Sequence, residues 1–374
     1  MKNQINILHV GPFPPPYSGL NVSLKNFLDS NSLRECNNFV YNISQGILPG
    51  KSDKLKLPSS KRIFRHLTIA INVVKEIKKN KIDILHFQGS SHDLSFMGNW
   101  LSILAAKILG VKVLWHIHDD LSDKKVMFPG KSFISRRIFK LLSRSADVVA
   151  TLSSKSKKIV ENLNEKIKVA VIPPCINISS KNKIQFEQNN FSVLYVGWLI
   201  KDKGIFDLIK IAKILHDRKI DVRFSVLGTG MSEIETNKVI TKIEELELQD
   251  IIYLKGVVIG EEKEKYYQNS TVFISPTYWD AFPLVILEAM AFGLPIITTK
   301  VGGIPEIIGE EGKAIFHEPG DIEGMVNSII LLKENAHLCE EMEEKNKNRF
   351  ENNFHIEKIA SKTLAIYYGL SGKI

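Results

Sequence analysis

The chain has 374 residues, of which 44% are apolar and 24% are charged, so it is globular and longer than one compact core usually supports. Its three cysteines, Cys36, Cys175 and Cys339, are far apart and form no CxxC pair, which argues against a disulfide framework or a zinc knuckle. No apolar run reaches the roughly 18 to 20 residues of a membrane span, and no apolar leader precedes Pro12. We therefore expect a cytoplasmic, two-domain protein that begins near Met1.

The net charge of +9 is divided unevenly along the chain. Residues 1–180 hold 27 Lys and Arg against 12 Asp and Glu, whereas residues 181–374 hold 23 against 29. A basic half attracts anionic partners such as lipid headgroups or an anionic acceptor, although solubility alone explains the same excess equally well. No RNP aromatics, zinc finger or arginine-rich tract favours nucleic acid, so we expect no nucleic-acid partner.

The first half alternates short β-rich runs with longer amphipathic stretches. The predicted strands are residues 5–10, 83–88, 111–118, 148–151 and 169–172, and the clearest helical patterns cover 63–79 and 91–109. This alternation predicts a parallel sheet with helices on both faces.

A polar stretch at 179–190, after Pro173 and Pro174, interrupts the pattern and is the predicted linker. A second series follows, with predicted strands at 192–196, 222–227, 251–255, 272–275, 296–298 and 314–316. A charged helix is predicted at 334–352, and a final helix from 356 has no strand after it, so it could pack on the first domain. We predict an N-terminal domain, 1–178, completed by 356–374, and a C-terminal domain, 186–355. Both should be doubly wound, Rossmann-like α/β domains, with the catalytic cleft between them.

The most informative segment is YWDAFPLVILEAMAFGLPIITTKVGGIPEII, residues 278–308. Pro283 stands where a helix should begin. The helix N-terminus would present backbone N–H groups near Phe282 to Val285, and these suit a diphosphate. Glu288, about one turn later, can accept two hydrogen bonds from a ribose diol. A surface glutamate on an ordinary amphipathic helix explains the residue equally well.

Two further segments place charged or flexible residues at strand ends. VGWLIKDKGIFDLIKIAKIL, residues 196–215, puts Lys203 and Gly204 between a strand and a helix, so Lys203 could bind the diphosphate or be a solvated residue at the helix start. In GPFPPPYSGLNVSLKNFL, residues 11–28, Gly19 would let the backbone approach a substrate closely.

Histidines end two strands of the first half. His116 and His118 share one face of the strand in VKVLWHIHDD, but no third ligand has suitable spacing, so we expect no metal site. His118 should point into the cleft. His86 ends the preceding strand, where a role in the polar core is open.

The stretch 61–81 combines apolar residues with basic ones. The apolar residues are Ile63, Phe64, Leu67, Ile71 and Val74, and the basic residues include Lys61, Arg62, Arg65, Lys75, Lys78 and Lys79. It could rest on an anionic membrane. An ordinary helix with its apolar face in the domain core is the alternative.

Segment 278–308 resembles the donor-binding signature of the retaining family 4 (group 1) glycosyltransferases, usually E-G-F-x-L-x-x-x-E-A-M-A-x-G-x-P-V. The two acids that lie eight positions apart are Asp280 and Glu288 here. The match continues through Gly293, Pro295, Gly302, Gly303, Pro305 and Glu306. Residues 196–204 resemble the family's V-G-R-L-x-x-x-K-G. The departures are Asp280 for Glu, Ala281 for Gly, Trp198 for Arg, Leu20 for the second glycine of the N-terminal loop, and VIPPCIN for I-P-N-G-V-D at 171–177.

The resemblance implies a GT-B fold and a retaining transfer of a sugar from a nucleotide sugar to a glycan or lipid-linked acceptor. It implies no cofactor and no obligatory metal. Carried over, the catalytic residues are His118, Lys203 and Asp280; the donor site is formed by Gly19, Trp198, Lys203, Phe282, Pro283, Leu284 and Glu288; and His86 lies near the acceptor. Losing the arginine at Trp198 removes a charge-assisted hydrogen bond of about 1.5 to 3 kcal/mol, for which Lys201 could substitute.

Two other functions fit the same sequence. Trp198, Asp280 and Leu20 would suit a non-catalytic GT-B module that binds a partner transferase or a membrane. A sugar-nucleotide epimerase or a phosphorylase would keep the fold and change the reaction.

Overall fold

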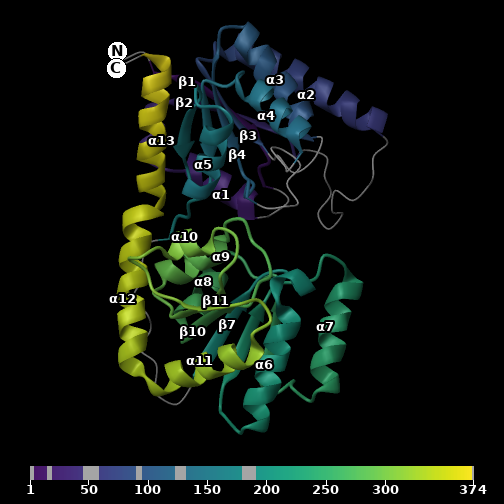
Figure 1. The fold of residues 1–374 in the computed structure, drawn as a ribbon, viewed down its shortest axis with the longest axis vertical. Helices are drawn as coiled ribbons and strands as arrows, with labels where there is room; N and C mark the ends of the chain where they lie inside the picture. Colours follow the sequence, from purple (N-terminus) through teal and green to yellow (C-terminus); the bar gives the residue numbers. More distant parts are fainter. Residues whose placement is uncertain are drawn as a thin grey trace. The chain divides into compact units, whose positions relative to one another are not determined.

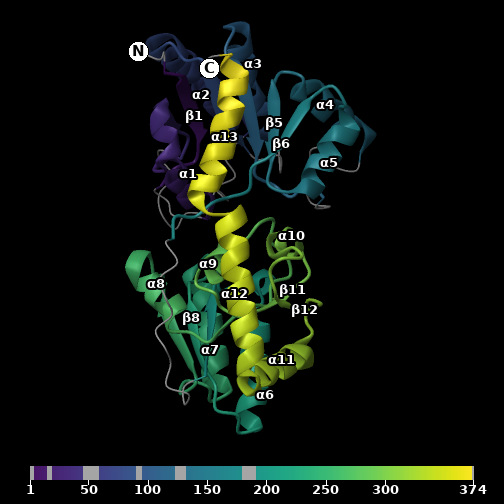
Figure 2. The ribbon, with the colours of Figure 1, turned by 90° about the vertical axis from the view of Figure 1, so that its left-hand side faces the viewer.

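The computed structural model describes residues 4–14, 19–44, 59–89, 95–122, 132–178 and 191–372. The chain forms two compact units (Figures 1 and 2), each built around one six-stranded parallel sheet. Unit 1 consists of Met1–Asn177 and Phe354–Ile374, and unit 2 of Ile178–Asn353. The predicted linker at 179–190 lies outside the described residues. The predicted class, parallel α/β, is confirmed.

The sheet of unit 1 has the strand order β2-β1-β3-β4-β5-β6. Its strands are β1 (Asn6–Gly11), β2 (Asn37–Asn42), β3 (Ile84–Gly89), β4 (Lys112–Ile117), β5 (Val148–Thr151) and β6 (Lys168–Val171). Five of them were predicted within a residue or two. The edge strand β2 was not, because its sequence NNFVYN holds three asparagines, which are depleted in strands.

Helices cover both faces of this sheet. They are α1 (Gly19–Leu28), α2 (Ser59–Asn80), α3 (Ser95–Ile108), α4 (Phe133–Ser143), α5 (Ser154–Leu163) and α13 (Ile356–Ser371), with the 3-10 turn η1 (Ser32–Glu35). One core joins α2, α3, α4 and α5 to residues such as Leu85 and Phe87, and the other joins α1 and α13 to residues such as Ile84. Since alternate strand residues point to opposite faces, the final helix covers the face that α2 to α5 leave open.

The sheet of unit 2 has the order β12-β11-β10-β7-β8-β9. Its strands are β7 (Ser192–Val196), β8 (Arg223–Leu227), β9 (Ile252–Gly256), β10 (Val272–Ser275), β11 (Ile296–Thr299) and β12 (Ile315–His317), as predicted within a residue. Its helices are η2 (Lys201–Lys203), α6 (Ile205–Asp217), α7 (Glu233–Glu245), α8 (Gly260–Gln268), α9 (Leu284–Ala291), α10 (Ile304–Ile308), α11 (Ile322–Glu334) and α12 (Ala336–Asn353).

Both strand orders contain a switch point, where the chain reverses its direction across the sheet. In unit 2 the chain runs from β7 outward to β9 and returns to β10 on the other side of β7; in unit 1 the same reversal lies between β1 and β3. The loops that follow two such strands leave in opposite directions and open a crevice at the carboxyl end of the sheet, where ligands of α/β proteins bind.

Candidate functional site

Lys203 and Asp280 meet at the switch point of unit 2. Lys203 ends the turn η2 after β7, and Asp280 lies in the loop after β10. The Nζ atom of Lys203 lies 2.5 Å from Oδ2 of Asp280 and 3.1 Å from the carbonyl oxygen of Trp279. The two charged side chains are 23% and 24% exposed. An ammonium group has three donors, so these contacts leave one N–H of Lys203 for a further acceptor.

Glycines let the loops of this site pack backbone against backbone. Gly204, with φ of +77°, lies so close to Pro276 that a Cβ atom would stand 2.0 Å from the Pro276 carbonyl oxygen. Gly302, with φ of +54°, would place a Cβ atom 1.6 Å from the carbonyl oxygen of Asp280. Only glycine fits either position, so the loop that carries Asp280 is held in place by the loop after β11.

The helix α9 starts next to Asp280. Pro283 is its N-cap residue, one position earlier than the first helical residue, with an extended backbone and no side-chain cap. The first N–H groups of the helix therefore point out of its N-terminus, where the macrodipole is positive. Phe282 and Pro283 are buried and Leu284 is partly buried, so this end of the helix is firmly packed.

Glu288 lies one turn further along α9 and is 13% exposed. Its Oε1 atom accepts a hydrogen bond from Lys263 Nζ at 2.7 Å, and its Oε2 atom accepts one from the Tyr267 hydroxyl at 2.7 Å. Burial, and then the nearby Glu288 charge, raise the pKa of Tyr267 well above its usual value, so the phenol stays protonated and donates. Each carboxylate oxygen can accept a second hydrogen bond, so Glu288 is oriented but not saturated.

Trp198 lies directly after β7 with its side chain 44% exposed. Its carbonyl oxygen accepts a hydrogen bond from the buried Tyr195 hydroxyl at 2.9 Å, and that hydroxyl also lies 3.2 Å from the carbonyl oxygen of Lys203. Tyr195 thus fixes the backbone of the loop after β7, and the indole of Trp198 remains accessible at the end of the strand. Lys201, the predicted substitute for an arginine, is exposed in η2.

In unit 1, the predicted residue His118 directly follows β4. Its Nε2 atom lies 2.5 Å from Oε1 of Gln88, while its Nδ1 atom is buried without a hydrogen-bond partner in the described part of the chain. His86 is almost fully buried on β3 and contacts Gln88 and the hydroxyl of Tyr367 on α13. The structure therefore favours the polar core role for His86 over an acceptor contact.

Two more buried histidines, His9 and His116, extend this group. The His9 ring lies 5.4 Å from His86, and the His116 ring 4.0 Å from His118, between ring centroids. Burial lowers the pKa of His9 and of His116 to about 4, and it lowers that of His86 and His118 well below the usual value. All four rings are therefore neutral near pH 7. Across the described residues, no cluster of three His, Cys, Asp or Glu side chains could hold a metal ion.

Gly19 is the first residue of α1 and is exposed. Residues 15–18 and the side chain of Leu20 lie outside the described part of the chain. The helix is fixed by Ser23, whose hydroxyl bonds the backbone of Cys175 at 3.2 Å.

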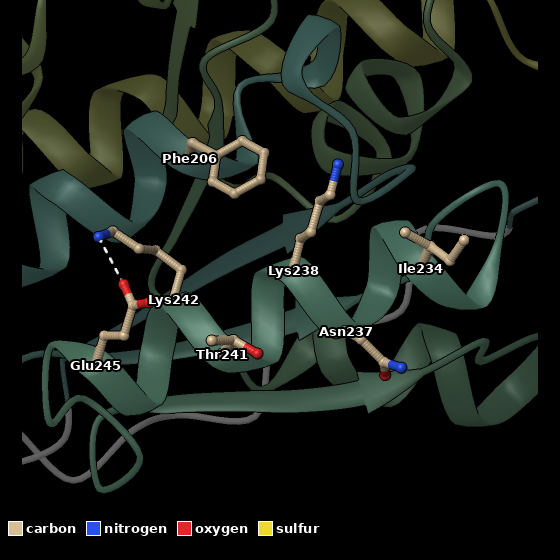
Figure 3. Close-up of a pocket in the computed structure, with 7 residues that line it drawn as sticks. All are labelled: Phe206, Ile234, Asn237, Lys238, Thr241, Lys242 and Glu245. Carbon is tan, nitrogen blue, oxygen red and sulfur yellow. Dashed lines mark hydrogen bonds and ion pairs between the residues drawn. The ribbon is translucent and has the colours of Figure 1, made fainter.

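A separate hollow of about 550 Å³ lies between α6 and α7 (Figure 3). It is lined by Phe206, Ile234, Asn237, Lys238, Thr241, Lys242 and Glu245. Lys242 and Glu245 pair with each other at 2.9 Å, and none of the predicted site residues lines the hollow.

Sequence reasoning missed the residues that orient the predicted ones. Lys263 and Tyr267 lie on one face of α8, four positions apart, but an acidic and basic helix of this kind gives no signal for a site. Gln88 and Tyr367 were also missed, because the contacts of Gln88 with His118 and of Tyr367 with His86 join different elements.

Two family models match the chain, and together they cover residues 45–349. Residues 45–180 match the model described as Glycosyltransferase Family 4, and residues 177–349 match the model described as Glycosyl transferases group 1. The resemblance to the family 4, group 1 glycosyltransferases is therefore confirmed.

Similar proteins agree with these matches. The capsular polysaccharide biosynthesis glycosyltransferase CapM of Staphylococcus aureus is 30% identical over 246 residues, which cover 60% of this chain and 61% of CapM. An Escherichia coli protein, UDP-Gal:alpha-D-GlcNAc-diphosphoundecaprenol alpha-1,3-galactosyltransferase, is 24% identical over 322 residues, 82% of this chain and 80% of that protein. The matched region spans between 61% and 66% of the length of CapM and two further relatives.

A solved structure supports the fold. HepE from Anabaena, in complex with UDP, aligns with a TM-score of 0.72 and 16% identity, over 98% of this chain and 100% of that chain. The predicted GT-B fold is confirmed by such neighbours.

Replacing Gly302 by alanine should destabilise unit 2, because the new methyl group would strike the Asp280 carbonyl oxygen. We expect a loss of about 3 kcal/mol in the free energy of unfolding, from left-handed backbone strain and overpacking together, measured by urea denaturation. Gly260→Ala is the control, since its φ is +63° but nothing lies within 4 Å of its Cβ position. It should cost only about 1 kcal/mol; equal losses would contradict the backbone contact.

The four neutral histidines predict that acid destabilises unit 1. As the pH falls from about 6.5 toward about 4, the unfolded chain binds protons that buried His9 and His116 do not, so stability present above pH 6.5 is lost. At the acid limit, each of these two groups lowers the free energy of unfolding by about 3 kcal/mol. Urea unfolding at several pH values should show that His116→Gln loses less free energy of unfolding on acidification than the unaltered protein does. The exposed control His216→Gln should lose as much as the unaltered protein. An equal loss in His116→Gln would disprove the assignment.

Proposed function

Because the chain resembles the family 4, group 1 glycosyltransferases over residues 45–349, we propose that it transfers a sugar from a nucleotide sugar to a glycan or lipid-linked acceptor. The context we propose is bacterial-type surface polysaccharide or glycolipid synthesis, as in CapM. One observation carries the proposal. The cation Lys203, the N-terminus of α9 and the carboxylate of Glu288 come together around the β7–β10 switch point, and these are the groups that a diphosphate and a ribose require.

Each group has a proposed role. Glu288 accepts hydrogen bonds from the ribose hydroxyls through the lone pairs that Lys263 and Tyr267 leave open. Lys203 binds the diphosphate together with the backbone N–H groups of Phe282 and Leu284. Asp280 accepts from hydroxyls of the donor sugar while it keeps its contact with Lys203. Trp198 would flank the donor, and Gly19 and His118 would approach it from unit 1.

The mechanism we propose is retaining and independent of metal or cofactor. A departing nucleoside diphosphate gains negative charge, which Lys203 and the positive end of α9 are arranged to stabilise. The acceptor hydroxyl would attack from the face of the leaving group, and the departing phosphate would take its proton. This route needs no protein base, and it fits a site whose histidines are neutral and whose Asp280 is already paired.

HepE structures contain UDP or UDP-glucose, so uridine donors are the first to test here. A thermal-shift screen of UDP, GDP, ADP and CMP with their sugar conjugates, without and with magnesium, should show one selective, metal-independent shift. A ligand at a hundredfold excess over Kd stabilises by about 2.7 kcal/mol. Glu288→Ala should abolish the shift and Lys203→Ala should abolish transfer, whereas Glu341→Ala, which removes ion pairs to Lys313 and Lys345 on unit 2, should change neither.

The other outcomes identify the alternatives. The exposed Trp198 at the expected arginine position favours a non-catalytic module, and flat curves for every nucleotide with folded protein would support it. A donor consumed without an acceptor would indicate an epimerase, and a requirement for phosphate would indicate a phosphorylase. Full activity in both Glu288→Ala and Lys203→Ala would rule out the proposed site.

We also propose that unit 1 meets an anionic membrane surface from the cytoplasm. In α4, Phe133, Ile134 and Leu141 are 68%, 68% and 60% exposed, and every charged residue of that helix is basic. In α2 the core face is Ile69, Val73 and Ile77. Phe64, Leu67 and Ile71, three of the apolar residues singled out in the sequence, are exposed instead. Apolar residues among cations are typical of helices that lie in a membrane interface. No helix in the described ranges has the length and apolarity to cross a bilayer.

Flotation with vesicles tests this surface. The protein should bind vesicles that contain about a third phosphatidylglycerol and lose binding at high salt, because the attraction is partly electrostatic. Phe133→Ser with Leu141→Ser should weaken binding about tenfold or more, since each exposed side chain contributes up to about 1.5 kcal/mol on burial. The matched control is Ile234→Ser, which alters an apolar residue of unit 2 that is 70% exposed. Equal binding to neutral vesicles, or no effect of the double variant, would refute the membrane role of α4.

A further inference from the structure

A line of buried hydrogen bonds connects the final helix of the chain to His118. The Tyr367 hydroxyl on α13 lies 2.5 Å from Nδ1 of His86, whose Nε2 lies 2.9 Å from the amide nitrogen of Gln88. The amide oxygen of Gln88 in turn lies 2.5 Å from Nε2 of His118. Tyr367, His86 and Gln88 are all 1% exposed or less, so these atoms have no water to replace a lost partner.

Donor and acceptor roles along this line depend on each other. The Gln88 amide nitrogen can only donate, so Nε2 of His86 accepts and the His86 proton is on Nδ1. That proton is donated to the oxygen of Tyr367. At the other end, the Gln88 oxygen can only accept, so His118 carries its proton on Nε2. Nδ1 of His118 is then a bare lone pair.

The opposite arrangement is also self-consistent. If the Tyr367 hydroxyl donates to His86, the His86 proton moves to Nε2, the Gln88 amide turns over, and the proton of His118 moves to Nδ1. The two arrangements interconvert only as a unit, because each intermediate step places two donors or two acceptors face to face. The direction of one hydrogen bond on α13 therefore decides whether His118 offers an acceptor or a donor.

We infer that Tyr367 is a positioning residue that sets the tautomer of His118. It acts through His86 and Gln88. The Gln88 amide has its nitrogen toward His86 and its oxygen toward His118, and this is the arrangement in which Tyr367 accepts, the His118 proton is on Nε2 and Nδ1 presents a lone pair. A second observation points to a ligand: this Nδ1 atom is buried and has no partner among the described residues. The group it recognises must be a hydrogen-bond donor, which for a sugar substrate is a hydroxyl and not an ionised phosphate oxygen. This inference rests on the proposed function, in which His118 approaches the donor.

The experiment combines histidine ¹⁵N NMR with kinetics. In protein with ¹⁵N-labelled histidine, the His118 ring signals, assigned from a His118→Gln sample, should show the Nε2–H tautomer near pH 7.5. Tyr367→Phe removes only the hydroxyl, and we expect the His118 signals to move toward a mixture of tautomers. Tyr368→Phe is the matched control, because it removes a hydroxyl that lies 2.9 Å from Glu35 at the next position of α13. It should leave the His118 signals unchanged.

Gln88→Leu removes the amide that connects His86 to His118, and it tests the same connection with a second variant. Once Gln88 is leucine, adding Tyr367→Phe should produce no further change at His118. In the active enzyme, Tyr367→Phe should lower kcat/KM for the nucleotide sugar about tenfold, roughly the effect of one hydrogen bond, while Tyr368→Phe should stay within about twofold.

The outcomes separate the two proposals. If the His118 tautomer is unchanged in Tyr367→Phe, the positioning role of Tyr367 is overturned, whatever Gln88→Leu does. If the tautomer responds as expected but no nucleotide sugar binds or reacts, the positioning role stands and the proposed function fails. If the tautomer responds while kcat/KM of Tyr367→Phe matches that of Tyr368→Phe, the link between this tautomer and substrate recognition is refuted.

Discussion

The parallel pairing of β10 with β7 is the constraint on which the site of unit 2 depends. It places strands that are about 80 residues apart in the chain side by side, with the intervening β8 and β9 on the far side of β7. The two loops that leave this pair therefore start side by side, and Lys203 in one lies 2.5 Å from Asp280 in the other. The glycine contacts at Gly204 and Gly302 then fix both loops, because any side chain there would collide with backbone. Tightly packed loop backbone of this kind suits a site that must hold charged groups in place before a ligand binds.

Two basic side chains of that site are each held by an acidic one. Lys203 pairs with Asp280, and Lys263 pairs with Glu288, so the arrangement is close to neutral even though unit 2 contains most of the acidic residues. Neutral pairing limits the cost of partly burying four charges. In the proposed function, a diphosphate would therefore bind to the third N–H of Lys203 and to the N-terminus of α9, rather than to an excess of free cations. Trp198, where the resemblance of residues 196–204 led us to expect arginine, fits a site that uses fewer charges.

The sequence predicted elements better than contacts. Hydrophobic periodicity located most strands of both sheets, because buried parallel strands are continuous apolar runs. It failed for the edge strand β2, whose three asparagines interrupt the apolar run. The helix at Pro283 and the acid Glu288 were predictable because they lie within one short segment. Their partners were not. Tyr267 and Lys263 lie on another helix, and Gln88 joins two histidines only because β3 and β4 pair in one register. Such contacts are set by tertiary packing, which a single sequence does not display.

The position of α13 links the end of the chain to both the stability and the chemistry of unit 1. Ile359, Leu364 and Tyr367 fill the sheet face that α2 to α5 do not cover, so the second core of this unit is incomplete until the final helix packs. The same helix supplies the hydroxyl next to His86, 281 positions away in sequence. Closing a loop of this length costs entropy, which the contacts of the final helix must offset. Packing the last helix therefore does two things at once: it closes the core, and it orders the line of polar side chains that ends at His118.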